Sequence, residues 1–125
     1  MERRSSMRRE TSAYLWDALQ AARAAGQFIE GVEYQEFVGD LMRRSAVERQ
    51  IEVLGEALNR IRRADPDVSS AIEDADRIIG MRNIIVHEYG SIDYLLVWQS
   101  VTMRVPALAA LLASLLEEHG QDSTP

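Results

Sequence analysis

The chain has 125 residues, which suits a single domain over residues 1–125 with a modest core, and we expect no second domain. It contains no Cys, which excludes disulfides, thiolate zinc sites and thiol catalysis. Its two His residues lie far apart, so we expect neither a metal site nor another cofactor. The formal net charge of -6 repels nucleic acid at long range and argues against a protein that coats DNA or RNA without a local site.

The apolar residues are not arranged as a membrane or targeting segment. The longest apolar stretch, residues 105–116, is interrupted by Pro106 and Ser114 and is far shorter than the roughly 20 residues that a membrane span requires. The Arg-rich start, residues 1–10, is followed by no apolar segment of signal-peptide type. We therefore expect a soluble, cytoplasmic protein with no membrane partner.

Helical spacing dominates the sequence and predicts an all-α bundle of four to five helices. No internal repeat and no alternating run long enough for a strand is present. The first predicted helix is capped by Thr11 or Ser12 and runs to about Ile29, before Gly31. Its apolar side is predicted to comprise Tyr14, Leu15, Ala18, Leu19, Ala22 and Ala25.

A second helical stretch is predicted to begin near Tyr34. Within it, five apolar residues recur at steps of four and three residues and predict a packing seam: Val47, Ile51, Leu54, Leu58 and Ile61. Away from the seam lie Glu48, Glu52 and Glu56. Neighbouring carboxylates can serve as acid and base or hold a cation, but an exposed helix face explains these three more simply.

Arginines supply nearly all of the positive charge, because Lys is absent. They could form stripes that offset the acidic surface where RNA approaches, but solvated helix faces explain most of them better, and none can be singled out. The residues in question are Arg43, Arg44, Arg49, Arg60, Arg62, Arg63 and Arg77.

The sequence Asp-Pro-Asp at residues 65–67 predicts a sharp break, because the residue before Pro is pushed out of helical geometry. Ser69 or Ser70 can cap a third helix that runs on to about His87. Gly90 and Ser91 predict the next break.

A final helix is predicted to follow this break, with a kink at Pro106. Its apolar residues are Leu95, Trp98, Val101, Val105, Leu108, Leu112 and Leu115. The polar residues 120–125 are expected to form a disordered tail.

The third helix is predicted to separate polar from apolar side chains. Winding it at about 100° per residue places Arg82, Asn83 and His87 away from a core stripe. That stripe is Ile78, Met81, Ile84 and Ile85. Ile79 and Val86 fall among the polar side chains, where we expect a second subunit to cover them. A twofold axis past this face would bring two copies of Arg82 and His87 into one cleft.

Residues 82–89 read Arg-Asn-Ile-Ile-Val-His-Glu-Tyr and combine the groups that phosphodiester chemistry needs. The Arg82 guanidinium can hold a phosphate in a fork of donors, the Asn83 amide can orient it, and the His87 imidazole can move a proton near neutral pH. Taken alone, Arg82 and His87 also fit ordinary polar groups at a surface or interface, and Tyr89 fits a packing residue near a helix end.

The spacing of Arg, four residues, His, one residue and Tyr resembles the signature of the HEPN superfamily, and within it the HepT-like toxins of MNT-HEPN toxin-antitoxin modules. The signature falls on Arg82, His87 and Tyr89, and Asn83 occupies the polar position that commonly follows the Arg. The likeness also includes residues 46–50, 55–57 and 78–98 and spans roughly half of the chain.

The resemblance implies a homodimeric, metal-independent endoribonuclease toxin that is restrained by a nucleotidyltransferase antitoxin. In such a reaction the RNA 2′-hydroxyl attacks the neighbouring phosphorus and leaves a 2′,3′-cyclic phosphate. His87 would carry the proton, Arg82 would clamp the phosphate, and Asn83 would position it or orient the imidazole. Tyr89 would accept AMP from the antitoxin. The alternative is a non-catalytic dimeric helical module that binds a nucleotidyltransferase partner or nucleotide.

Overall fold

The computed structural model describes residues 2–87 and 92–122, with the side chains of residues 2–8 and 119–122 left aside. The described residues form helices and no strand, which confirms the predicted all-α class. The helices are α1 (Glu2–Ile29), α2 (Tyr34–Gly39), α3 (Leu41–Ala64), α4 (Pro66–Ser70), α5 (Ala75–His87), α6 (Tyr94–Gln99), the π-helical turn η1 (Ser100–Arg104) and α7 (Val105–Asp122).

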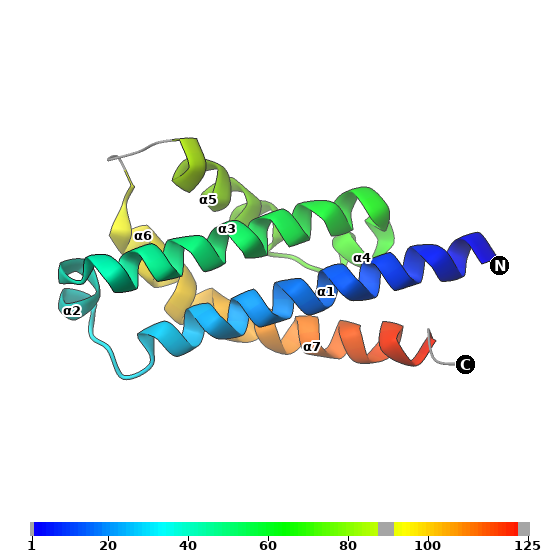
Figure 1. Cartoon of the computed structure of the whole chain (residues 1–125), viewed down its shortest axis with the longest axis horizontal. Coiled ribbons are helices and arrows are strands. Elements are labelled where there is room, and N and C mark those ends of the chain that lie inside the picture. Colours follow the sequence, from blue (N-terminus) through cyan, green and yellow to red (C-terminus); the bar gives the residue numbers. More distant parts are fainter. Residues whose placement is uncertain (1, 88–91, 123–125) are drawn as a thin grey trace.

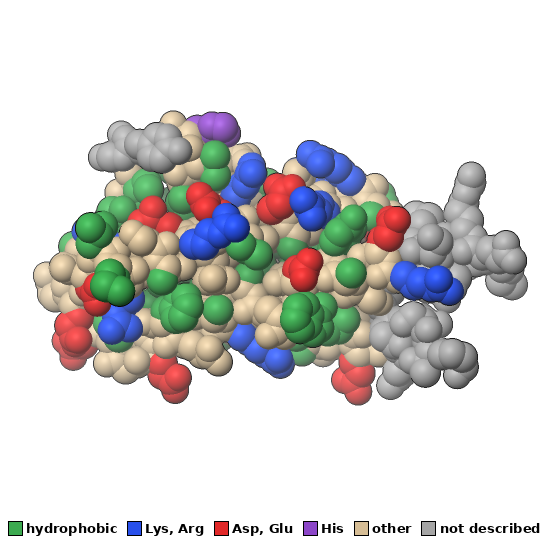
Figure 2. Space-filling model, viewed as in Figure 1, with side chains coloured by type: hydrophobic (Ala, Val, Ile, Leu, Met, Phe, Trp, Pro, Cys, Tyr) green, Lys and Arg blue, Asp and Glu red, His purple; other side chains and the backbone are tan. Residues whose placement is uncertain are grey.

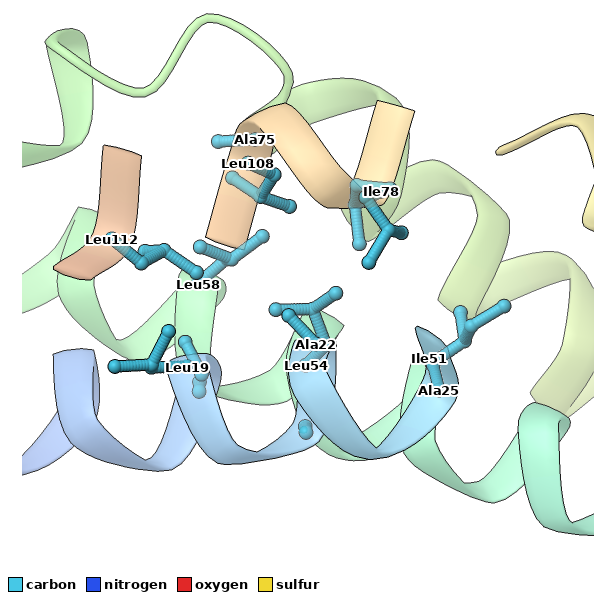
Figure 3. Close-up of a cluster of buried hydrophobic side chains, with 14 of the residues drawn as sticks. Leu19, Ala22, Ala25, Ile51, Leu54, Leu58, Ala75, Ile78, Leu108 and Leu112 are labelled. Atoms are coloured by element: carbon cyan, nitrogen blue, oxygen red, sulfur yellow. The ribbon is translucent and has the colours of Figure 1, made fainter. Parts of the chain in front are cut away.

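The long helices pack in a bundle in which α1 contacts both α3 and α7, and α5 packs on α3 (Figure 1). Figure 3 shows side chains of α1, α3, α5 and α7 that converge on a shared core. The labelled residues of this core are Leu19, Ala22, Ala25, Ile51, Leu54, Leu58, Ala75, Ile78, Leu108 and Leu112. The predicted seam of α3 is confirmed, because each of its five apolar residues is at most 1% exposed.

One predicted helical stretch is in fact two helices, α2 and α3. Asp40 separates them in an extended conformation, and its carboxylate accepts the backbone N–H of Arg43 at 3.1 Å, so that it caps α3. This hydrogen bond lowers the pKa of the Asp40 carboxyl below its usual value. The spacing of apolar residues in the sequence does not reveal this break, because Asp40 is the only residue between the two helices.

The start of the first helix was predicted wrongly. Helix α1 begins at Glu2, and Thr11 lies inside it with no exposed surface. The Thr11 hydroxyl donates to Asp65 Oδ2 at 3.3 Å, so it ties α1 to the turn between α3 and α4. The start of the third predicted helix was also wrong. Ser69 and Ser70 lie inside the short helix α4, which Asp65 caps by accepting the Val68 N–H at 3.2 Å, and α5 begins only at Ala75.

Aromatic side chains hold the start of α6 against α2 and α3. The Phe37 ring lies 5.3 Å from the Trp98 ring and 6.3 Å from the Tyr94 ring. The Tyr94 hydroxyl donates to Glu48 Oε2 at 2.9 Å, and the Arg44 guanidinium lies 4.8 Å from the centre of the same ring. Burial, followed by the contact with Glu48, raises the pKa of Tyr94. Glu48 is therefore a packing partner and not one of three equivalent solvated carboxylates.

The predicted kink at Pro106 is confirmed, and a π-helical turn precedes it. The Val105 N–H donates to the Ser100 carbonyl five residues earlier, and Pro106 has no N–H with which to continue the regular ladder. Figure 1 shows the chain changing direction between α6 and α7. Helix α7 continues to Asp122, beyond residue 120, where the polar tail was expected to start.

The segment Tyr94–Glu118 is apolar enough, with a mean hydropathy of 1.5, to cross a membrane by length and composition alone. It is longer than the apolar run recognised from the sequence, because η1 joins α6 and α7 into one continuous path. Its buried members, Val97, Val101, Val105, Leu108 and Leu112, belong to the core that packs against the other helices. In the most apolar 18-residue window of this segment, 33% is buried inside the bundle.

Candidate functional site

Helix α5 carries Arg82, Asn83 and His87, and it packs its apolar side into the core through three buried residues, Ile78, Met81 and Ile85. Two predictions about this helix are wrong. Ile79 is only 7% exposed and is covered within the chain, so it needs no second subunit, whereas Ile84 is 38% exposed and lies outside the core. Helix α3 packs on the side of α5 that carries Arg82 and Ile79. The buried face of α5 therefore differs from the apolar face that the sequence predicts.

Helices α3 and α5 lie very close together at Gly55. A Cβ atom placed on this residue would lie 2.5 Å from Arg82 Cβ and 2.9 Å from Arg82 Cγ. Both distances are too short for any side chain, and both involve the stem of Arg82 and not its flexible end. Glycine at this position therefore allows the two helices to meet and fixes where the Arg82 side chain leaves α5.

The Arg82 guanidinium is held by two side chains. Its Nη1 donates to Asn83 Oδ1 at 2.9 Å, and its Nη2 lies 3.3 Å from Glu56 Oε2 in an ion pair. Its Nε is buried and has no hydrogen-bond partner among the described residues. Since each terminal nitrogen carries two hydrogens, one donor on each remains available for a further acceptor. The side chain is 29% exposed, so such an acceptor can arrive from solvent.

Arg82 lines a groove of about 700 Å³ between α1, α3 and α5. Its other lining residues combine charged and small side chains: Asp17, Gln20, Ala21, Ala24, Arg49, Gln50, Glu52, Val53, Glu56, Ala57, Arg60 and Val86. Figure 2 shows arginine and acidic side chains intermingled across the surface rather than segregated by sign. Among the described residues, no three His, Asp or Glu side chains are grouped closely enough to hold a metal ion.

His87 is exposed at the last position of α5 and does not line this groove. Within the described part of the chain, it forms no hydrogen bond or ion pair with another side chain. Five residues of α-helix turn it about 140° away from Arg82. One chain therefore joins Arg82 to Asn83, while His87 lies one helical turn beyond Asn83 on the same face of α5 and away from Arg82. Tyr89, the expected AMP acceptor, lies outside the described residues.

Comparison with known proteins places this arrangement in a family. The family model described as Ribonuclease HepT-like matches residues 18–115. The chain belongs to the HepT-like family. Several similar proteins come from Methanocaldococcus jannaschii. The one named "Putative RNase MJ1380" is 35% identical over 81% of this chain and 92% of its own length. The one named "Putative RNase MJ1216" is 28% identical over 92% of this chain and 95% of its own length.

The protein named "Probable ribonuclease HepT" of Thermococcus cleftensis is 26% identical over 82% of this chain and 92% of its own length. No solved structure matches the chain significantly. The HepT-like match includes the motif at residues 82–89 and every lining residue of the groove except Asp17. Membership is consistent with the resemblance drawn from residues 82–89.

Sequence reasoning did not identify Gly55, Glu56 or Arg60 as neighbours of the motif. From the sequence, Glu56 belongs to an exposed helix face, and Arg60 is one of several arginines of which none can be singled out. Their positions off the apolar seam of α3 signalled only that they were not core residues. A glycine inside a long helix that otherwise consists of good helix formers was the one available signal of a close approach.

Proposed function

We propose that this HepT-like protein is the toxin of a toxin-antitoxin module and a metal-independent endoribonuclease that acts in the cytoplasm. The observation that carries the proposal is the Arg82 guanidinium, which is anchored by Asn83 and Glu56 at the edge of an open groove with unused donors. The exposed His87 on the same helix supplies a group that can transfer protons. The names of the relatives, which describe RNases, support the same reaction class.

The proposed reaction uses the RNA substrate's own 2′-hydroxyl as the nucleophile. A neutral His87 imidazole removes its proton while the 2′-oxygen bonds to the adjacent phosphorus. The bond from phosphorus to the 5′-oxygen breaks, and a protonated imidazole donates a proton to the departing oxygen. Arg82 stabilises the charge that gathers on the phosphoryl oxygens, and Asn83 keeps the guanidinium in place. The products are a 2′,3′-cyclic phosphate and a 5′-hydroxyl.

This scheme needs two imidazoles, and the motif of one chain provides only one, that of His87. We propose that a homodimer supplies the second. Asn83, Ile84 and His87 are exposed on the outer side of α5, and Ile84 also lines a depression of about 740 Å³ with Leu96 and Met103. These apolar side chains, in place of the Ile79 expected earlier, would be covered by a second copy whose α5 crosses the first.

Regulation is proposed to occur at Tyr89, two residues beyond His87. An MNT-type nucleotidyltransferase antitoxin would add AMP to its hydroxyl. The added phosphodiester would place negative charge and bulk beside the position where the RNA phosphate binds, so the modified protein would not cleave RNA.

A non-catalytic role is the second candidate, and one observation favours it. Arg82 and His87 do not meet within a single chain, as expected if the helices only present a dimeric surface to a nucleotidyltransferase or a nucleotide. Both candidates use the same bundle. They differ in whether purified protein cuts RNA by itself.

The test is digestion of RNA by the purified protein in excess chelator, followed by analysis of the new ends. We expect cleavage that leaves 2′,3′-cyclic phosphates and 5′-hydroxyls, and complete resistance when the ribose at the cut position is replaced by 2′-deoxyribose. Efficient cleavage of DNA, or an absolute requirement for magnesium, would contradict the mechanism. If the protein forms a dimer but RNA stays intact under every condition, the ribonuclease proposal is wrong and the non-catalytic docking module is the function that remains.

A further inference from the structure

Glu56 joins two arginines that come from different helices. Its Oε2 lies 3.3 Å from Arg82 Nη2, and its Oε1 lies 3.3 Å from Arg60 Nε. The two guanidiniums are therefore separated by no more than these two contacts and the width of one carboxylate. Because two guanidinium groups share one carboxylate, they have donors left that can bind a second anion.

Arg60 is oriented toward the groove by its own surroundings. It follows Glu56 by one helical turn on α3, and its guanidinium lies 6.0 Å from the centre of the Tyr14 ring on α1. The aromatic face and the carboxylate hold the guanidinium between α1 and α3. With 53% of its side chain exposed, Arg60 is accessible to a ligand in the groove.

Three arginines and three carboxylates line the groove: Arg49, Arg60, Arg82, Asp17, Glu52 and Glu56. Arg49 lies 3.4 Å from Glu52, and Glu56 serves both Arg60 and Arg82. These ion pairs are partly exposed, so they contribute little to stability and can be exchanged at small cost. Exchange of the Glu56 carboxylate for an RNA phosphodiester replaces one singly charged acceptor with another, whose two non-bridging oxygens a guanidinium group can bind in a bidentate manner.

The shape of the groove suits an extended polyanion. Small side chains, Ala21 and Ala24 from α1 and Ala57 from α3, leave its floor open, and the groove runs from Arg82 on α5 to residues of α1. A strand whose scissile phosphate lies at Arg82 would bring the adjacent phosphate close to Arg60.

We propose that Arg60 binds the RNA phosphate next to the scissile one, and that this phosphate displaces the Glu56 carboxylate that links Arg60 to Arg82. The inference rests on the proposed ribonuclease function and assigns the groove between α1, α3 and α5 as a subsite for the flanking RNA backbone. Arg60 is a binding residue, and Glu56 is the counter-ion that occupies the subsite when no RNA is present.

The test uses RNA oligomers with a single cleavable ribonucleotide, in which one linkage next to the cut carries either a normal phosphate or an uncharged methylphosphonate. Both flanking sides are examined. For the native protein, we expect neutralisation on one side to lower kcat/KM by about 10-fold, the size of one charge-assisted contact. In Arg60→Gln, kcat/KM for the phosphate oligomer should already be lowered to the same degree. The methylphosphonate should lower it no further, because the contact between Arg60 and the flanking phosphate is already lost.

Arg63→Gln is the matched control, because it removes the same charge from an exposed position on α3 that does not line the groove. It should keep the native ratio between the two oligomers. Arg60→Lys retains the charge and should restore part of the ratio. Far-ultraviolet circular dichroism establishes that each variant is folded.

The outcomes separate this inference from the proposed function. If native protein cleaves the oligomers but Arg60→Gln keeps the full methylphosphonate effect, Arg60 does not bind the flanking phosphate and the inference is wrong. If Arg60→Gln lowers cleavage of both oligomers equally, Arg60 acts only through Glu56 and Arg82, and the inference is again wrong. If native protein cleaves no oligomer, the proposed function itself fails and the subsite fails with it.

Discussion

Replacement of His87 by Ala is expected to lower kcat for RNA cleavage by about 10²–10⁴-fold, the usual contribution of a positioned proton-transfer group. The imidazole is exposed and makes no hydrogen bond within the described residues, so its removal should change the free energy of unfolding by less than about 0.5 kcal/mol. Loss of activity would then report lost chemistry and not lost structure. Single-turnover cleavage and chemical denaturation of the same preparation provide the two measurements.

His119→Ala is the control for this experiment, since it removes the chain's other imidazole, to which no site role is assigned. It should retain native activity. The account would be in error if His87→Ala cleaved RNA at the native rate, or if both variants lost activity to the same degree. A His87→Ala protein that still arrests growth would also exclude the enzymatic candidate.

Gly55→Ala is expected to damage the site without replacing a proposed catalytic residue. The new methyl group would lie 2.5 Å from Arg82 Cβ, so α3 and α5 must separate or Arg82 must shift. Overpacking of this kind costs about 1–3 kcal/mol, partly offset by the roughly 1 kcal/mol that Ala gains over Gly in a helix. A displacement of Arg82 by about 1 Å is expected to lower kcat/KM by about 10²-fold.

The matched control is Gly26→Ala, the same change within helix α1. An added Cβ atom there meets no atom within 4 Å, so the substitution should stabilise the protein by about 0.5–1 kcal/mol and leave cleavage unaffected. Unfolding in denaturant and steady-state cleavage of both variants measure the difference. Equal stability and equal activity for the two would show that the contact of Gly55 with Arg82 does not position the guanidinium.

Much of the fold was predictable because it depends on periodicity along single helices. The seam of α3, the end of α5 at His87 and the kink at Pro106 each follow from residues close together in the chain. The start of α1 was not predictable in this way, because Thr11 looks like a cap but is buried against Asp65, which lies 54 residues later. Likewise, a hydrogen-bonding Asp40 divides a stretch that apolar spacing presents as continuous.

The site was predictable only where its residues are neighbours in the sequence. Arg82 and Asn83 are adjacent and do contact each other. Glu56 and Arg60 could not be connected with them, because the connection depends on how closely two helices approach, and a glycine sets that distance. Ile79 and Ile84 exchanged their expected environments for the same reason. A helical wheel gives angles within one helix but does not say on which side the neighbouring helix packs.

The most direct test of the central claim is the activity of a mixed dimer. The claim is that His87 from each of two copies serves one RNA cleft. Native and His87→Ala chains carrying different affinity tags are co-expressed, the mixed dimer is purified through both tags, and sedimentation establishes its mass. We predict activity close to that of the His87→Ala homodimer, because a single imidazole cannot serve as both base and acid. Half of the native activity, or a protein that sediments as a monomer while it cleaves RNA, would contradict the shared cleft.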